Sequence, residues 1–290
     1  DNLDDTSTGL HYLQEKQTTQ DSTNGPILEV RNLSKIFITP SSLLKAKQLF
    51  TAVKDVNFTV RRGETVGIVG ESGSGKSTIG RMILGLEDIT EGSVIYRGKD
   101  LKLITDTNER RAHCLSMQCI FQDPYSSLNP RMTAGENITY GLRVHKMISS
   151  GDAKSLAQEL MALVGLPRED AEKLPHAFSG GERQRIGIAR ALSYRPDFIF
   201  CDEPTSALDV SVQANLLNLL KDLQEKFSLT LLFVSHDLAV IRQMCDRVIV
   251  MKEGEALESD SNDNIFEHPK HQYTRSLLDA MPKFKGLAPT

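Results

Sequence analysis

The sequence predicts an α/β fold in which helices cover both faces of a largely parallel sheet. Short, almost wholly apolar segments alternate with helical patterns, and such segments are typical of strands buried on both faces. The 290 residues, 39% hydrophobic and 25% charged, suffice for one large domain with a smaller lobe. No apolar run approaches the ~18 residues that a membrane-spanning helix needs.

Charge and cysteine content exclude several classes of function. The chain has 34 Lys and Arg against 38 Asp and Glu, a formal net charge of −4. This balance lacks the basic excess that proteins use to bind the nucleic-acid backbone. Four cysteines without a C-x-x-C pair argue against a disulfide framework or a cysteine-based zinc site. We therefore expect a protein of a reducing compartment, without a nucleic-acid partner.

The beginning of the chain is expected to lack a fold of its own. Residues 1–25 are polar, with few apolar anchors, and are predicted to be disordered or a linker. Order should begin near Pro26, where Ile27–Val30 starts an alternating strand pattern. A second strand is expected around Val53–Val60, and residues 38–50 are expected to form an excursion between the two strands.

Four buried segments are expected to form the parallel sheet: Thr65–Val69, Phe198–Cys201, Leu231–Val234 and Arg247–Met251. Helices are predicted over Ser77–Leu86 and Val210–Phe227. The stretch Ser126–Leu192 contains helical patterns but no convincing buried strand, so we expect a helical lobe inserted into the sheet domain.

A phosphate-binding loop is predicted at Gly70-Glu71-Ser72-Gly73-Ser74-Gly75-Lys76-Ser77, which matches G-x-x-x-x-G-K-[ST] between a buried strand and a helix. Glycines let backbone N–H groups turn toward an anion, and the helix N-terminus adds unpaired donors. Lys76 would reach the β- and γ-phosphates, and the Ser77 hydroxyl would bind Mg²⁺. A chance match to a glycine turn occurs in roughly one chain in a hundred, and the strand–helix context makes it rarer.

Two acidic residues, Asp202 and Glu203, follow the predicted strand Phe198–Cys201. Neighbouring side chains at a strand end point in different directions and can serve different tasks. Asp202 would hold Mg²⁺ directly or through water, and Glu203 would polarise an attacking water. Alone, such a pair is more often an ordinary exposed one; the phosphate loop, which requires a metal partner, favours the catalytic interpretation.

Three further places carry polar residues suited to a nucleotide. Ser179-Gly180-Gly181-Glu182 opens a predicted helix and is either a second anion-binding terminus or an ordinary N-cap. Gln122, at the exit of a strand, could join the Mg²⁺ or water shell or be a surface loop residue. His236, after another buried strand, could donate to a γ-phosphate oxygen or be an ordinary histidine at a helix start. Two phosphate-directed loops either close on one nucleotide or share nucleotides between two copies.

With these motifs in this order, the sequence resembles the nucleotide-binding subunit of an ATP-binding-cassette (ABC) transporter, from about Leu28 to Pro282. The matching motifs are Walker A at 70–77, the Q-loop at Gln122, the signature at Phe178–Glu182, Walker B at Phe198–Asp202 with Glu203, the D-loop at Ser206–Asp209 and the switch histidine His236. The resemblance implies a P-loop NTPase with a RecA-like parallel-sheet core, an antiparallel β subdomain and an inserted helical subdomain.

The resemblance also implies a division of the chain and a set of site residues. Residues 26–260 would form the ABC ATPase domain, with its helical subdomain at about 126–192, and 261–290 a C-terminal extension. ATP and Mg²⁺ would be the cofactors, with Glu203 and His236 catalytic and Phe37 stacked on adenine. Mg²⁺ would be held by Ser77, Gln122 and Asp202, and the nucleotide by Phe37, Gly70, Glu71, Ser72, Gly73, Ser74, Gly75, Lys76, Ser77, Thr78, Gln122, Ser179, Gly180, Gly181, Glu182 and Asp209.

Two stretches resemble the oligopeptide/dipeptide importer branch: Gln122–Arg131 and His268–Leu278, the latter similar to its His-Pro-Tyr-Thr-Arg tail with the tyrosine shifted to 273. The resemblance implies an ATPase that powers peptide import from the cytoplasmic face of the bacterial inner membrane. Its partners would be a second cassette, identical, different or fused, two membrane permeases and, indirectly, an extracytoplasmic solute-binding protein. Related cargo, such as glutathione, opines or nickel complexes, is an alternative, and a soluble ATPase without a transport role is a weaker one.

Two features depart from the family pattern. Glu182 stands where the family usually has glutamine, and we expect it to weaken or retune the contact with a triphosphate. The chain lacks the cysteine cluster that some relatives carry after the tail, so no iron–sulfur centre is expected. A start at Asp1 is compatible with the rear cassette of a fusion.

Overall fold

The computed structural model describes residues 25–38 and 49–280. Residues 1–24 of the predicted linker, most of the excursion over 38–50 and the last ten residues of the 261–290 extension lie outside these ranges.

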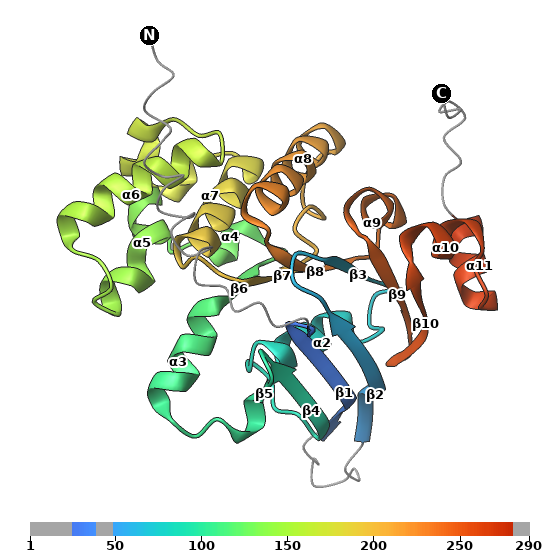
Figure 1. Ribbon diagram of the computed structural model, residues 1–290. Helices are drawn as coiled ribbons and strands as arrows, with labels where there is room; N and C mark the ends of the chain where they lie inside the picture. Colours follow the sequence, from blue (N-terminus) through green and yellow to red (C-terminus); the bar gives the residue numbers. More distant parts are fainter. Residues whose placement is uncertain (1–24, 39–48, 281–290) are drawn as a thin grey trace, which may run out of the picture.

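The main sheet has six strands in the order β10-β9-β3-β8-β7-β6 (Figure 1). All neighbours are parallel except β10, which runs antiparallel to β9. The four predicted buried strands are confirmed. The six strands are β3 Thr65–Val69, β6 Met117–Ile120, β7 Phe198–Asp202, β8 Thr230–Ser235, β9 Arg247–Lys252 and β10 Glu255–Ser261.

Alternating side chains on the central strands explain why these strands are apolar throughout. In β7, Phe198 and Phe200 belong to one hydrophobic cluster, while Ile199 and Cys201 belong to the other. One cluster includes residues of α8 (Val210–Phe227), α9 (Leu238–Met244) and the helices of 126–192. The other includes residues of α2 (Lys76–Ile83) and of a second sheet. A strand that faces two cores needs apolar residues on both faces.

The second sheet is four-stranded and antiparallel, in the order β2-β1-β4-β5. It lies beside the main sheet, with α2 near the junction between them (Figure 1). Strand β2 starts earlier than the predicted Val53–Val60. The strands are β1 Leu28–Ile38, β2 Leu49–Val60, β4 Glu91–Tyr96 and β5 Lys99–Asp100.

The longest helix, α8 Val210–Phe227, has the predicted bounds, whereas α2 covers Lys76–Ile83 and ends before the predicted Leu86. The early end coincides with Gly85, whose φ of 68° lies outside the helical region. The other α-helices are α3 Thr107–Ser116, α4 Pro124–Ser127, α5 Ala134–Val144, α6 Ser150–Leu163, α7 Gly180–Ser193, α9 Leu238–Met244, α10 Asn262–Glu267 and α11 Gln272–Asp279, and the 3₁₀ turns are η2 Leu101–Leu103, η3 Arg168–Glu172 and η4 Pro175–Ala177.

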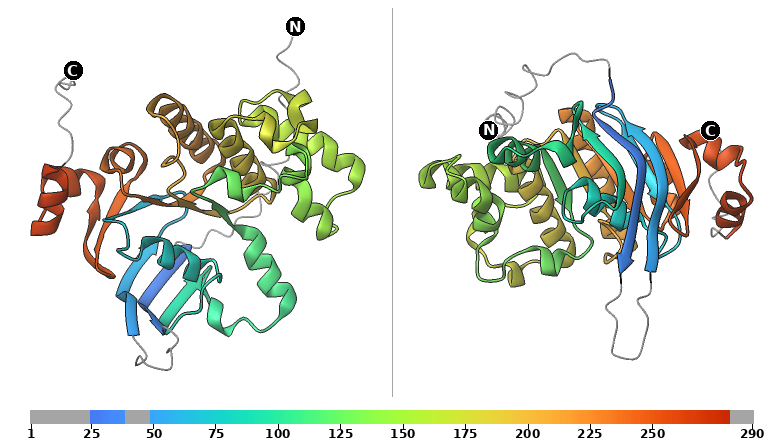
Figure 2. Two further views of the ribbon diagram at one scale, coloured as in Figure 1. Left: turned by 180° about the vertical axis from the view of Figure 1, so that it is seen from behind. Right: turned by 90° about the horizontal axis from the view of Figure 1, so that it is seen from below.

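The two edges of the main sheet, at β6 and at β10, are covered by different parts of the chain. Every residue of 126–192 is described, and this segment contains helices and no strand. Its helices lie beyond β6, whereas α10 and α11 lie beyond β10 at the opposite edge (Figures 1 and 2). None of the helices in the described ranges is both long and apolar enough to cross a membrane.

Helix α2 packs against β7 at very short range because Gly80 has no side chain. A Cβ atom at Gly80 would lie 1.9 Å from Cζ of Phe200, which is fully buried. This close approach brings the first turn of α2, with Ser77, beside the end of β7, where Asp202 lies.

Candidate functional site

The glycine-rich loop joins β3 to α2 and has the conformation that its sequence demands. Gly75 precedes the first helical residue with φ of 99°, in the left-handed region that favours glycine. A Cβ atom there would lie 2.4 Å from the carbonyl oxygen of Ala52 in β2. On its other side the loop meets the β9–β10 turn, since the Gly254 amide donates to the Ser74 carbonyl at 3.2 Å. The loop is therefore fixed between β2 and this turn.

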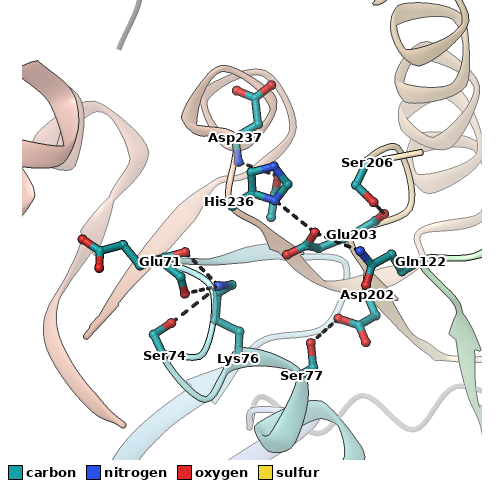
Figure 3. Close-up of polar contacts among 12 residues, drawn as sticks. Glu71, Ser74, Lys76, Ser77, Gln122, Asp202, Glu203, Ser206, His236 and Asp237 are labelled. Carbon is teal, nitrogen blue, oxygen red and sulfur yellow. Dashed lines mark hydrogen bonds and ion pairs between the residues drawn. The ribbon is translucent and has the colours of Figure 1, made fainter. Parts of the chain in front are cut away.

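Lys76 is buried within the loop, with 4% of its surface exposed. Its ammonium donates to the carbonyl oxygens of Gly70 and Glu71, both at 2.8 Å, and lies 3.5 Å from Oγ of Ser74 (Figure 3). Burial lowers the pKa of Lys76, while nearby carboxylates, Glu203 foremost, oppose that shift. A buried ammonium that donates to neutral carbonyl oxygens can donate to anionic phosphate oxygens instead, and those hydrogen bonds are stronger.

Ser77 and Asp202 form the second part of the site. The Ser77 hydroxyl donates to Oδ1 of Asp202 at 2.7 Å (Figure 3). Burial raises the pKa of Asp202, and the charge of Glu203 acts in the same direction. A hydroxyl beside a desolvated carboxylate is a set of hard oxygen donors that fits Mg²⁺. The described residues contain no group of three or more His, Cys, Asp or Glu side chains able to hold a metal, so a cation here would take further oxygens from a phosphate or water.

Three predicted residues meet at one carboxylate (Figure 3). Oε2 of Glu203 lies 3.0 Å from Nδ1 of His236 and accepts from Nε2 of Gln122 at 3.4 Å. They follow β7, β8 and β6, whose carboxyl ends share one edge of the parallel sheet. Glu203 has φ of 45°, which is uncommon for a residue other than glycine. Such backbone strain concentrates at functional sites.

Gln122 is linked to the signature helix α7 by a buried amide that the sequence did not single out. Nε2 of Gln184, in α7, donates to the carbonyl oxygen of Phe121 at 3.0 Å, and only 2% of Gln184 is exposed. The next residue after Gln122, Asp123, caps α4 by accepting from the Tyr125 amide at 2.8 Å. The sequence offered one sign of this role: Gln184 is a polar residue on the apolar face of its helix.

Ser179 caps α7 in a reciprocal arrangement with Glu182. The Glu182 amide donates to Oγ of Ser179 at 3.3 Å, while the amide and hydroxyl of Ser179 both donate to Oε2 of Glu182 at 2.8 Å. The amide contact is the main reason that the pKa of Glu182 is lowered. The Glu182 carboxylate thus points back to the helix start. Every hydrogen bond of Ser179 in the described structure stays within its own helix, and none reaches the phosphate loop.

Two predicted ligands, Asp209 and Phe37, lie outside this cluster. Asp209 caps α8, accepting from the Val212 amide at 3.0 Å. Phe37, near the end of β1, pairs across the sheet with Phe50, which the sequence analysis did not consider and which is 58% exposed. Phe50 is two residues from Ala52, whose carbonyl oxygen adjoins Gly75, so the Phe37–Phe50 pair lies two residues along β2 from the point where this strand meets the loop.

The remaining predicted residues lie on the phosphate loop, in α2 or at the start of α7. Ser72 and Gly73 are exposed on the phosphate loop, and Thr78 lies in the first turn of α2, whose amides have no partner within the helix. Gly180 and Gly181 form the first turn of α7, where a Cβ atom at Gly181 would lie 2.3 Å from Val212.

Comparisons with known proteins identify the family of the chain. The family model for the ABC transporter matches residues 53–206. A putative peptide import ATP-binding protein of Brucella ovis is 47% identical over 260 residues, which are 90% of this chain and 80% of the relative. An oligopeptide transport ATP-binding protein of Bacillus subtilis is 46% identical over 257 residues, 88% of this chain and 82% of the relative.

Solved structures extend the likeness to the fold. An ATP-binding cassette, dimeric in a post-hydrolysis state and bound to ADP and Pi, matches with a TM-score of 0.70 and 32% identity. The match covers 81% of this chain and 98% of that one. The predicted P-loop NTPase fold is therefore confirmed, and the chain belongs to the ATP-binding-cassette family of ABC transporters.

Proposed function

We propose that this chain binds and hydrolyses ATP to power the import of peptides of the oligopeptide or dipeptide class. The observation that carries the proposal is the convergence of Lys76, the Ser77–Asp202 pair and the Glu203 carboxylate near one edge of the parallel sheet (Figure 3). The family supports ATP binding and hydrolysis, and the names of relatives at 45–47% identity support peptide cargo.

Each part of the cluster has a role in the proposed reaction. Lys76 and the first amides of α2 would bind the phosphates. Ser77, Asp202 and Gln122 would hold Mg²⁺, whose charge would offset that of the phosphates. Glu203 accepts the proton of the attacking water as that water approaches the γ-phosphate. His236, at 3.0 Å, orients the Glu203 carboxylate and is in place to donate to a γ-phosphate oxygen.

A second cassette completes each site in this proposal. Ser179, Gly180 and Gly181 of one chain cover the nucleotide bound to the other, with Asp209 at the same interface. The dimeric solved relative supports this arrangement. Closure excludes water from the reacting phosphate and aligns Glu203 with it. We further propose Phe37 as the adenine platform, with Phe50 beside it.

The finer assignments follow from the importer branch. We propose an ABC ATPase domain over residues 26–260 with a helical subdomain at about 126–192, followed by an extension over 261–290. The chain would act at the cytoplasmic face of a bacterial inner membrane, with two permeases and, indirectly, an extracytoplasmic solute-binding protein. Gln122, tied to α7 through Phe121 and Gln184, would transmit the nucleotide state toward the permeases.

The test of this proposal has a biochemical and a cellular arm. Mg²⁺-dependent phosphate release should be lost in K76A and retained in E225Q, a control in the exposed Glu225 of α8. Co-purification from membranes should recover two permeases, and a deletion strain should lose uptake of a labelled oligopeptide. Uptake of a nickel complex, glutathione or an opine in place of peptide would redirect the cargo assignment. Co-purification with nucleic acid and without permeases would refute the transport role.

A further inference from the structure

The tail His268–Leu278 has no task in the proposed reaction, yet it contacts the phosphate loop. Helices α10 and α11 lie beyond β10, at the edge of the sheet opposite the helical segment (Figures 1 and 2). From α11, the Tyr273 hydroxyl accepts a hydrogen bond from the backbone amide of Glu71 at 3.4 Å. Two segments about 200 residues apart in sequence therefore meet beside the candidate nucleotide site.

The peptide group between Gly70 and Glu71 connects Tyr273 to Lys76. Its carbonyl oxygen, that of Gly70, accepts from the Lys76 ammonium at 2.8 Å, and its N–H donates to Tyr273. A hydrogen bond at each end of one peptide group fixes the plane of that group. Each of the two bonds also polarises the peptide group and so strengthens the other bond. Tyr273 thus acts on the orientation of the loop next to its buried lysine.

The segment that carries Tyr273 is held by a carboxylate clamp at Glu258, and the Tyr273 ring itself lies near a cation. Glu258 of β10 accepts from the amides of Lys270 and His271 at 2.8 and 3.1 Å and from the Thr274 hydroxyl at 2.5 Å. Although burial acts against it, these bonds keep the pKa of Glu258 below its usual value. The Lys252 ammonium lies 4.8 Å from the centroid of the Tyr273 ring.

We propose that Tyr273 is a positioning residue for nucleotide binding, through which the C-terminal tail holds the phosphate loop ready for ATP. The inference rests on the proposed ATP site and adds a residue outside its motifs. A loop that must turn its amides toward an anion loses conformational freedom on binding, unless that freedom is already restricted. By accepting a hydrogen bond from the Glu71 amide, Tyr273 restricts the conformational freedom of the loop before ATP binds.

The direct test compares Y273F with wild type and with Y140F. Phenylalanine keeps the ring beneath Lys252 and removes only the hydroxyl, whereas Tyr140 is a tyrosine of α5, 52% exposed, outside the site. In Y273F the Kd for Mg-ATP should rise by roughly twofold to tenfold, the range of a single hydrogen bond. Saturated kcat should stay at the wild-type value, and Y140F should match wild type in both constants.

A second variant tests the path through the clamp. E258Q replaces the Glu258 carboxylate, which accepts three hydrogen bonds, by a neutral amide. Like Y273F, it should raise the Kd for Mg-ATP. Because both variants act on one contact, their effects in the double variant should be less than additive. Hydrogen exchange at the Glu71 amide should accelerate in both variants, a readout that general destabilisation of distant parts would not select.

The outcomes separate this inference from the proposed function. A Y273F protein that binds Mg-ATP as tightly as wild type would overturn the inference, as would a lowered Tm with unchanged Kd, since Tyr273 would then be merely structural. Loss of binding in K76A with wild-type binding in Y273F would leave the ATP site standing and remove only the role of the tail. Wild-type binding in K76A would remove the proposed site itself.

Discussion

Replacing Glu203 by glutamine separates ATP binding from hydrolysis. The side chain keeps its size and one oxygen for the contacts of Gln122 and His236, at 3.4 and 3.0 Å, but loses the basic carboxylate. Lys76, Ser77 and Asp202 are untouched by the change. Mg-ATP should therefore bind at least as tightly as to wild type, because a negative charge near the phosphates is removed, while the attacking water loses its proton acceptor.

The size of the effect follows from the task assigned to Glu203. General base catalysis by a positioned side chain contributes roughly 10²- to 10⁴-fold in rate. At about 1.36 kcal/mol for each factor of ten, removal of the base raises the barrier by about 3 to 5 kcal/mol. We expect hydrolysis to remove the phosphate that bridges the two cassettes and so to open the dimer. When hydrolysis is blocked, the closed dimer should therefore accumulate.

The assay is phosphate release at saturating Mg-ATP, together with size-exclusion chromatography in the same nucleotide. E203Q should release phosphate at least a hundredfold more slowly than wild type and elute as an ATP-dependent dimer, with E225Q behaving as wild type. Turnover of E203Q at the wild-type rate would remove Glu203 from its role. A slow E203Q that also fails to bind ATP would show that Glu203 acts in binding.

Three other substitutions test the surroundings of the site. G80A should cost about 1 to 3 kcal/mol in the free energy of unfolding by urea denaturation, because its Cβ meets the Phe200 ring; unchanged stability would refute that packing. E182Q should lower the KM for ATP by about two- to threefold, because a neutral oxygen holds the Ser179 hydroxyl less firmly than the carboxylate does; a raised KM would contradict this. D202N should lose Mg²⁺-dependent hydrolysis by ~tenfold or more while resisting urea at least as well as wild type at neutral pH. Because the pKa of Asp202 is raised in the folded state, ionisation of Asp202 lowers the stability of the wild-type protein as pH rises. The stability advantage of D202N over wild type should therefore shrink as pH falls toward protonation of Asp202. Lower stability of D202N than of wild type at neutral pH would refute this.

Local signals made most of the core predictable. The buried strands could be identified because each faces two hydrophobic clusters and is apolar throughout, and α8 because its pattern runs unbroken from Val210 to Phe227. Strand β10, Glu255–Ser261, gave no such signal, since it is a polar edge strand with one neighbour in its sheet. The phosphate loop was predictable because its chemistry depends on contiguous residues.

The contact of the Glu182 carboxylate with Ser179 is local, and its S-x-x-E spacing is the pattern of a capping box, which the sequence analysis did not apply to Glu182. Contacts between distant segments, in contrast, were not predictable. Gln184 holds the carbonyl of Phe121 across 63 residues, and Tyr273 reaches Glu71 across 202. Single-sequence patterns carry no information on such pairs, because each partner looks ordinary in its own segment.

The central claim is that one chain supplies only part of each hydrolytic pocket and that a neighbouring cassette supplies the rest. The most direct measurement follows phosphate release per chain as the protein is diluted in Mg-ATP, with sedimentation velocity at the same concentrations. Activity should fall together with the associated fraction and vanish for the monomer. Full turnover by a monomer that sedimentation shows to be unassociated would contradict the claim.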